Sequence, residues 1–139
     1  MKRLTGTMAL CAVLLLAGCF GGDRQDEAAK LASRMNTAIQ KQDWDAAMSL
    51  YDDKFFAAVS RKLWRDKLEA LPKRFGLLSD IKLTFAQNNP RFGNNHYIFG
   101  YQLNYQHGVV DETITIVDVG NKGHLVVRDQ IFKHGENIL

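Results

Sequence analysis

Regular alternation of apolar and polar residues near the middle of the chain constrains its fold more than any other feature. Every second residue from Tyr97 to Tyr105 is apolar, and a similar alternation returns from Val110 onward. A period of two is typical of β-strands with one buried face. The apolar positions of the first strand are Tyr97, Phe99, Tyr101, Leu103 and Tyr105.

A two-residue turn at His107-Gly108 is predicted to join the two strands, because both residues tolerate a positive φ better than most. Pairing Gln106 with Val109 then sets Leu103 opposite Glu112 and Tyr101 opposite Ile114. This register places apolar side chains on one face of the hairpin and polar side chains on the other, as a half-buried hairpin requires.

The preceding part of the chain has a helical period, and three helices are predicted there. The first has acidic residues in its first turn, the second is capped by Asp43, and the third is capped by Ser60. Pro72 is expected to bend or end the third helix near Leu71. The predicted buried stripes are Ala28, Leu31, Ala32, Met35 and Ile39; Trp44, Ala47, Met48 and Tyr51; and Trp64, Leu68, Leu71 and Phe75.

Strands follow Gly76. The first is expected to alternate through Ile81, Leu83 and Phe85, residues 88–95 have the composition of a loop, and a last strand runs from about Leu125 to Phe132 with neither face clearly apolar. Helices followed by an antiparallel meander predict an α+β domain, with the N-terminal helices packed on a curved antiparallel sheet.

The N-terminus has the layout of a secretory signal: Lys2 and Arg3 precede a short apolar run that ends before Gly21. The run is about half the length that a membrane span needs. Its last residues, Leu16-Ala17-Gly18-Cys19, resemble the lipobox of bacterial lipoproteins. That resemblance implies cleavage before Cys19 and a diacylglycerol on its sulfur; the alternative is ordinary secretory cleavage.

The expected organisation is a lipoprotein signal peptide at 1–18, a lipidated tether at 19–25 and a single domain at 26–139. Because Phe20 and not Asp follows the cysteine, the resemblance implies the cell envelope, at the outer membrane facing the periplasm if the host is Gram-negative. Two or more acyl chains give a firm membrane anchor.

Removal of the signal peptide changes the composition that matters for function. The mature chain has 121 residues, and loss of Lys2 and Arg3 lowers the formal charge from +3 to +1, which argues against nucleic acid as a partner. Cys11 leaves with the signal and Cys19 is acylated, so no disulfide is expected. The four histidines are scattered, so no metal is expected, and no cofactor motif is present.

Two segments carry a resemblance to a known fold family. The run "QKQDWDAAMSLYDDKF" is similar to the opening helices of the nuclear transport factor-like, cystatin-like cone fold, and "YQLNYQHGVVDETITIVDVGNKGHLVVRDQIF" is similar to its closing strands. The resemblance implies a cone-like domain. The superfamily includes ketosteroid isomerase, whose base carboxylate lies inside the cone, and many binding modules.

Glu112 is the one charged residue on the predicted core face. It is either a pocket acid that contacts a ligand together with Tyr101, Leu103 and Tyr105, or a rim residue paired with an Arg or Lys. The rim interpretation is favoured because paired structural carboxylates outnumber catalytic ones.

Basic residues between 61 and 74 are a second candidate surface, either as a contact to anionic lipid or as a solvated helix face, and the solvated face is favoured. The sequence therefore predicts a membrane-anchored lipoprotein that acts as a binding module for an envelope partner or a small ligand. The alternatives are an isomerase-like enzyme with Glu112 as base and a purely structural envelope lipoprotein. The oligomeric state is left open.

Overall fold

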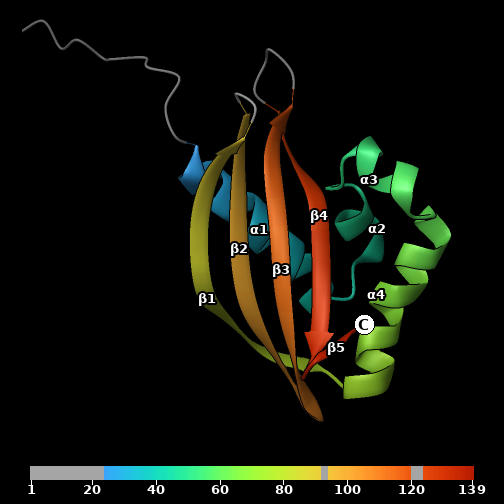
Figure 1. Cartoon of the computed structure of the whole chain (residues 1–139). Helices are drawn as coiled ribbons and strands as arrows, with labels where there is room; N and C mark the ends of the chain where they lie inside the picture. Colours follow the sequence, from blue (N-terminus) through green and yellow to red (C-terminus); the bar gives the residue numbers. More distant parts are fainter. Residues whose placement is uncertain (1–23, 92–93, 120–123) are drawn as a thin grey trace, which may run out of the picture.

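The structure is a computed structural model that describes residues 24–91, 94–119 and 124–139 (Figure 1). The predicted signal peptide and Cys19 lie outside the described residues. No helix in the described ranges has the length and apolar character needed to cross a bilayer. The elements are α1 Gln25–Gln40, α2 Trp44–Met48, α3 Asp53–Ala58, α4 Arg61–Phe75, β1 Leu78–Arg91, β2 Asn94–Tyr105, β3 Gly108–Val119, β4 His124–His134 and β5 Asn137–Ile138.

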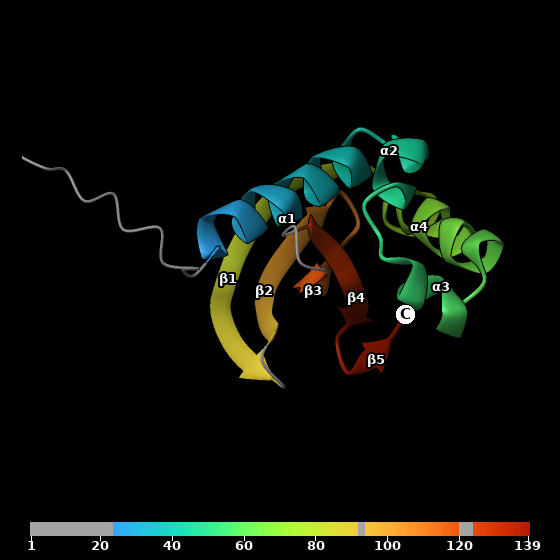
Figure 2. The same cartoon turned by 90° about the horizontal axis from the view of Figure 1, so that it is seen from above.

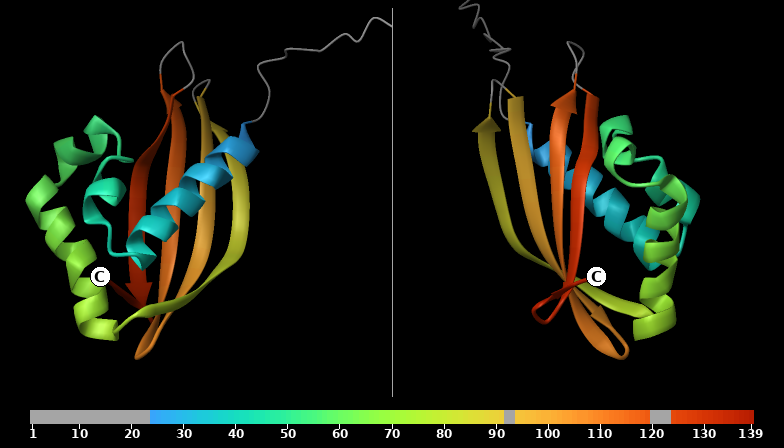
Figure 3. Two further views of the ribbon diagram at one scale, coloured as in Figure 1. Left: turned by 180° about the vertical axis from the view of Figure 1, so that it is seen from behind. Right: turned by 45° about the vertical axis from the view of Figure 1, so that its right-hand side comes forward.

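The five strands form one antiparallel sheet in the order β1-β2-β3-β4-β5. The sheet is strongly curved, with α1 across its inner side and α2 to α4 beside β4 (Figure 2). Seen from behind, α1 runs diagonally over the strands (Figure 3). The predicted α+β class, with helices packed on an antiparallel sheet, is confirmed.

The helix signals in the sequence are largely confirmed. All five residues of the predicted α1 stripe are buried. The Asp43 side chain accepts a hydrogen bond from the backbone N–H of Ala46 at 3.1 Å, and the Ser60 hydroxyl accepts one from Leu63 at 3.3 Å. Both residues therefore cap their helices as predicted, and each cap satisfies a backbone donor that the helix leaves free.

The alternative that Pro72 ends the third helix is wrong, and so is the predicted extent of the second helix. α4 continues past Pro72 to Phe75, because Leu71 and Phe75 are both buried in the core and Gly76, at φ 82°, ends the helix with an N–H bond to the Pro72 carbonyl at 2.9 Å. The second helix ends at Met48, so Tyr51 is not helical and instead forms a parallel bridge with Val127. The short α3 was not predicted.

The register of the β2–β3 hairpin differs from the predicted register by two residues. Tyr105 pairs with Gly108, Leu103 with Val110 and Tyr101 with Glu112, so the turn is Gln106-His107. Because a shift of two keeps every side chain on its face, the predicted inner and outer faces are still correct.

Tertiary contacts explain this turn. The backbone N–H groups of Gln106 and His107 donate to the carbonyls of Leu77 and Phe75, at 3.0 and 2.8 Å. A Cβ atom on Gly108 would lie 2.8 Å from Cδ1 of Phe75, so the close approach of Phe75 requires glycine there. The end of α4 thus fixes the turn, and the turn sequence alone does not.

β1 is longer and less regular than predicted. Residues 88–91 were expected in a loop but belong to the strand and pair as far as Arg91 with Asn94. Irregularities at Ser79 and Thr84 break the alternation, so that Leu83 lies opposite Tyr101 while Phe85 lies opposite Gly100. Leu83 and Phe85 therefore lie on opposite faces of the sheet, because each added residue reverses the side-chain parity.

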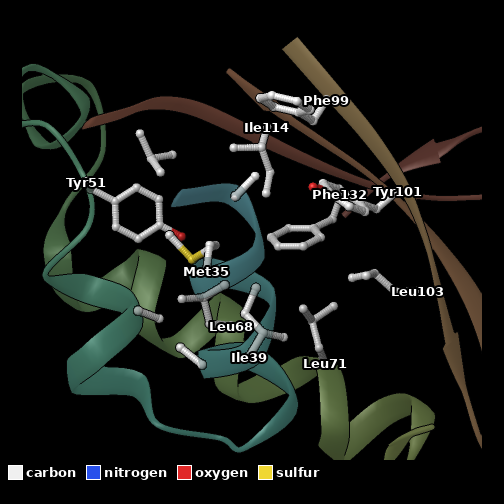
Figure 4. Close-up of a cluster of buried hydrophobic side chains, with 14 of the residues drawn as sticks. Met35, Ile39, Tyr51, Leu68, Leu71, Phe99, Tyr101, Leu103, Ile114 and Phe132 are labelled. Carbon is white, nitrogen blue, oxygen red and sulfur yellow. The ribbon is translucent and has the colours of Figure 1, made fainter. Parts of the chain in front are cut away.

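The core lies between α1, α4 and the inner face of the sheet (Figure 4). Met35 and Ile39 of α1 and Leu68 and Leu71 of α4 gather opposite the strand residues, and Tyr51 points into the same cluster. The labelled strand residues, all buried, are Phe99, Tyr101, Leu103, Ile114 and Phe132.

Candidate functional site

Glu112 lies deep in the core, on the inner face of β3 between Tyr101 of β2 and Phe132 of β4. It is 1% exposed. No Lys or Arg within the described ranges forms an ion pair with it. The expected rim ion pair is therefore wrong: the strand continues on both sides of Glu112, which keeps the carboxyl away from the sheet edge and from solvent.

A chain of buried hydrogen bonds ends at this carboxyl. The Gln130 side-chain amide donates to Glu112 Oε1, and the Tyr51 hydroxyl donates to Gln130 Oε1. The three side chains come from β3, from β4 and from the segment after α2. All three are buried, so their polar groups form hydrogen bonds with one another and not with water.

A β-bulge in β4 brings Gln130 into this chain. Thr115 pairs with Asp129 and Ile116 pairs with Val127, which leaves Arg128 as an extra residue. The extra residue reverses the side-chain parity, so Val127 points inward before the bulge and Gln130 and Phe132 point inward after it. This change of parity explains why neither face of the predicted last strand was clearly apolar.

The bulge also fixes Tyr51. The backbone of Val127 exchanges two hydrogen bonds with the segment, donating to Leu50 at 2.9 Å and accepting from Asp52 at 2.8 Å. Arg128, directed away from the core, forms an ion pair with Asp52. Tyr51 is held between these contacts, which aims its hydroxyl at Gln130.

Burial raises the pKa of Glu112 to about 8, and the hydrogen bond from Gln130 and the neighbouring amide of Asn36 counteract only part of this effect. Asn36 of α1 is buried, and its side-chain amide is in hydrogen-bonding geometry with no described residue. Glu112 Oε2 also has no hydrogen-bond partner among the described residues. At pH 7 the carboxyl is therefore mostly a neutral acid that holds its proton.

The other predicted site residues share the inner face with Glu112. Tyr101 pairs directly with it, and Leu103 and Tyr105 follow along β2. Burial, followed by the nearby Glu112 charge, raises the pKa of Tyr101 to about 12 and raises the pKa of Tyr105 as well. The Tyr105 hydroxyl has no hydrogen-bond partner in the described ranges, and the Glu112 carboxyl is bound by Gln130.

Gln130, Asn36 and the role of Tyr51 were missed by sequence reasoning. Asn36 interrupts the apolar stripe of α1 next to Met35, which is a detectable signal. The face on which Gln130 lies could not be predicted, because the bulge interrupts the alternation of apolar and polar residues that would indicate it.

Five hollows on the described surface have volumes of about 170 to 320 Å³, and none of these five is lined by Glu112. The largest of these five lies between Trp44, Pro72, Lys73 and Gln106. The smallest lies between Lys67, Leu71, Arg74 and Phe75. The polar cluster of Asn36, Tyr51, Glu112 and Gln130, which we call the interior cluster, is thus separate from these hollows.

The basic residues of α4 are mostly engaged within the domain. Lys62 pairs with Asp66 at 2.6 Å, and Arg61 pairs with Asp53 at 3.3 Å. Arg65 pairs with Asp45 at 2.5 Å and with Glu69 at 2.9 Å. These pairs engage Arg61, Lys62 and Arg65 but not Lys67, Lys73 or Arg74, so they favour a solvated helix face over a lipid contact along the first half of α4.

No protein-family model matches the chain, and no curated protein matches its sequence significantly. Within the described ranges, no three His, Cys, Asp or Glu side chains gather in an arrangement that could hold a metal ion.

Proposed function

We propose that this protein is a lipid-anchored lipoprotein of the cell envelope whose cone-like domain binds a partner protein. The lipobox-like Leu16-Ala17-Gly18-Cys19 supports the anchor. The long, curved antiparallel sheet with α1 across its inner side supports the likeness to the nuclear transport factor-like fold.

The observation that carries partner binding is the free edge of the sheet at β1. β1 is the first strand in the sheet order, and its residues 82–87 are all exposed. Leu83 is 53% exposed and Phe85 is 45% exposed. An edge strand offers unpaired backbone groups to an extended segment of another protein, and exposed apolar side chains on both faces give that segment specific contacts.

The alternative is an isomerase-like enzyme with Glu112 as base, and the raised pKa of Glu112 is the observation in its favour, since shifted carboxyls gather at functional sites. Enclosure weighs against it. A base must come within hydrogen-bond distance of the substrate, whereas Glu112 is buried and bound to Gln130. We infer that the interior cluster is structural and that the binding surface lies outside.

The anchor is tested by Cys19→Ala. This variant should lose its lipid and leave the detergent phase in a phase-partition assay, because no other residue of the mature chain can take a thioether-linked lipid. Unchanged partition would refute the lipoprotein interpretation.

Partner binding is tested by placing a photo-crosslinking residue at position 83 in intact cells. The captured protein, once purified, should bind the unmodified lipoprotein and should bind Leu83→Lys at least tenfold more weakly. Leu63→Lys is the matched control, because Leu63 is 65% exposed on α4, away from the edge. Equal binding by both variants would exclude the β1 edge as the partner site.

A further inference from the structure

α1 carries a line of cationic side chains on the face that points away from the sheet. Lys30 and Arg34 are four residues apart and Lys41, at the helix C-cap, is seven residues further, so all three lie along one side of the helix. All three are exposed, and none forms an ion pair with a described residue. We call Lys30, Arg34 and Lys41 the cationic stripe.

Four acids lie near the stripe, and three of them are engaged by other groups. Glu27 and Asp118 are both bound by Arg24, and the Asp43 side chain is occupied as the cap of α2. Asp26, in the first turn of α1, is the remaining exposed acid of the helix. These four acids equal Arg24, Lys30, Arg34 and Lys41 in number, so the positive charge is local to the stripe, whose three cations form no ion pair in the described ranges. On α4, ion pairs engage Arg61, Lys62 and Arg65.

Two shallow hollows flank the stripe, each of about 280 Å³, and both are lined by Arg34. One lies toward α2, between Thr37, Lys41 and Asp43. The other lies toward the start of β4, between Lys30, Leu125 and His124, and the ion pair of Arg24 with Glu27 lies at its wall. Arg34 can thus present its guanidinium to an anionic group on either side, with a second cation next to each hollow.

The stripe lies next to the expected lipid attachment point. Four residues separate Cys19 from Arg24, so the two Cα atoms are at most about 18 Å apart. Lys30 is about 9 Å further along the helix axis and Lys41 about 26 Å. A helix lying parallel to the bilayer would bring all three cations to the headgroups without stretching the tether.

We propose that the cationic stripe docks on anionic phospholipid headgroups of the membrane that holds Cys19, which orients the domain; this inference rests on the proposed lipid anchor. Headgroups fit better than a protein partner, because the exposed face of α1 has none of the large exposed hydrophobic residues of the described chain. Protein interfaces usually have such residues at their centre, whereas an anionic headgroup requires charge alone.

The test uses the lipidated protein reconstituted into vesicles, with a fluorophore on an introduced cysteine that is the one free thiol of the mature chain. Ser33→Cys reports from the exposed face of α1, and Asp111→Cys reports from the outer face of β3. The vesicles are phosphatidylcholine alone or with about a third phosphatidylglycerol, and both contain the same trace of a headgroup nitroxide lipid as quencher.

The label at position 33 should be quenched strongly in vesicles with phosphatidylglycerol and weakly in phosphatidylcholine, while the label at 111 should be quenched weakly in both. Lys30→Gln with Arg34→Gln should lower the ratio of docked to undocked domains about 30-fold, since each cation near an anionic surface contributes a factor of about five. Lys62→Gln with Lys73→Gln, which removes the same charge from α4, should leave the quenching unchanged.

Equal quenching at position 33 in the two kinds of vesicle, or no effect of the double α1 variant, would overturn the headgroup proposal while leaving the anchor intact. A protein that fails to float with either kind of vesicle would instead refute the lipid anchor. The two failures are therefore distinguishable in one experiment.

Discussion

The two sides of the sheet are built in opposite ways. Beside β4, the ring of Trp64 packs between those of Phe55 and Phe132, with centroid distances of 4.9 and 6.1 Å. The segment around Tyr51 pairs with the same strand. At β1, the sheet ends in a row of exposed residues. We infer that the β4 side carries most of the stability and that the β1 side is free to evolve contacts with a partner.

Replacing one phenylalanine on each side tests this comparison most directly. Phe132→Ala should lower the free energy of unfolding by about 4 kcal/mol, because it leaves a cavity beside Trp64, whereas Phe85→Ala should cost less than about 1 kcal/mol. Guanidinium denaturation of both variants measures the difference. Similar losses in the two variants would mean that the β1 side is as tightly packed as the β4 side.

The next largest effect concerns the pH dependence of stability that Glu112 introduces. Its folded pKa of about 8 lies above the ordinary glutamate value of 4.5, so the stabilisation that the buried proton provides is fully present in acid and declines as the pH rises toward the folded pKa. The parent should lose about 3 kcal/mol of stability between pH 4.5 and pH 7 through this group.

Glu112→Gln has no such proton to lose, so we expect it to match the parent at pH 4.5 and to exceed its stability at pH 7. Denaturant melts at the two pH values measure this, with Glu136→Gln, an exposed carboxyl between β4 and β5, as the control for charge. The rim ion pair predicted from the sequence requires Glu112→Gln to be less stable than the parent at pH 7. That result would contradict the buried neutral carboxyl and support the ion pair.

Tyr51→Phe is expected to have a smaller effect on the β4 side. Loss of the hydroxyl leaves Gln130 Oε1 without its buried donor and should cost about 1–2 kcal/mol. Tyr105→Phe is a matched control, because the Tyr105 hydroxyl is buried without a partner among the described residues and its removal should be neutral or slightly stabilising. If thermal melts rank the two variants in reverse order, the hydrogen-bond chain is not structural.

The smallest effect is expected at the open edge. Leu83→Lys should change the free energy of unfolding by no more than about 0.5 kcal/mol, because the side chain is half exposed and lysine is common on edge strands. Circular dichroism melts can establish this before any binding experiment. A larger loss would show that Leu83 is part of the core. Weaker partner binding by this variant would then no longer be evidence for a binding site at β1.

Features set by local sequence were predictable. The buried stripe of α1, the caps Asp43 and Ser60 and the inner face of the β2–β3 hairpin each depend on residues within a few positions of one another, and all four are confirmed. The position of Glu112 on the core face follows from the same alternation.

Features set by distant contacts were not predictable. The turn at Gln106-His107 depends on Phe75 and Leu77, more than twenty-five residues earlier in the chain. The partner of Glu112 was predicted wrongly for a related reason: burial forbids a simple ion pair, and the hydrogen bond comes from Gln130, which reaches the core only because of the β4 bulge. Alternation rules assume a regular strand, and they fail wherever one residue is added.

The β4 bulge has a consequence for comparing this chain with others. A homologue with a regular last strand would have one residue fewer between the positions of Val127 and Gln130, so an ungapped alignment would set inward residues against outward ones beyond that point. Such an alignment would score poorly over the very strand that closes the sheet, although the two backbones superposed closely. A one-residue gap at Arg128 would restore the match, and distant relatives of this domain should be sought with that gap allowed.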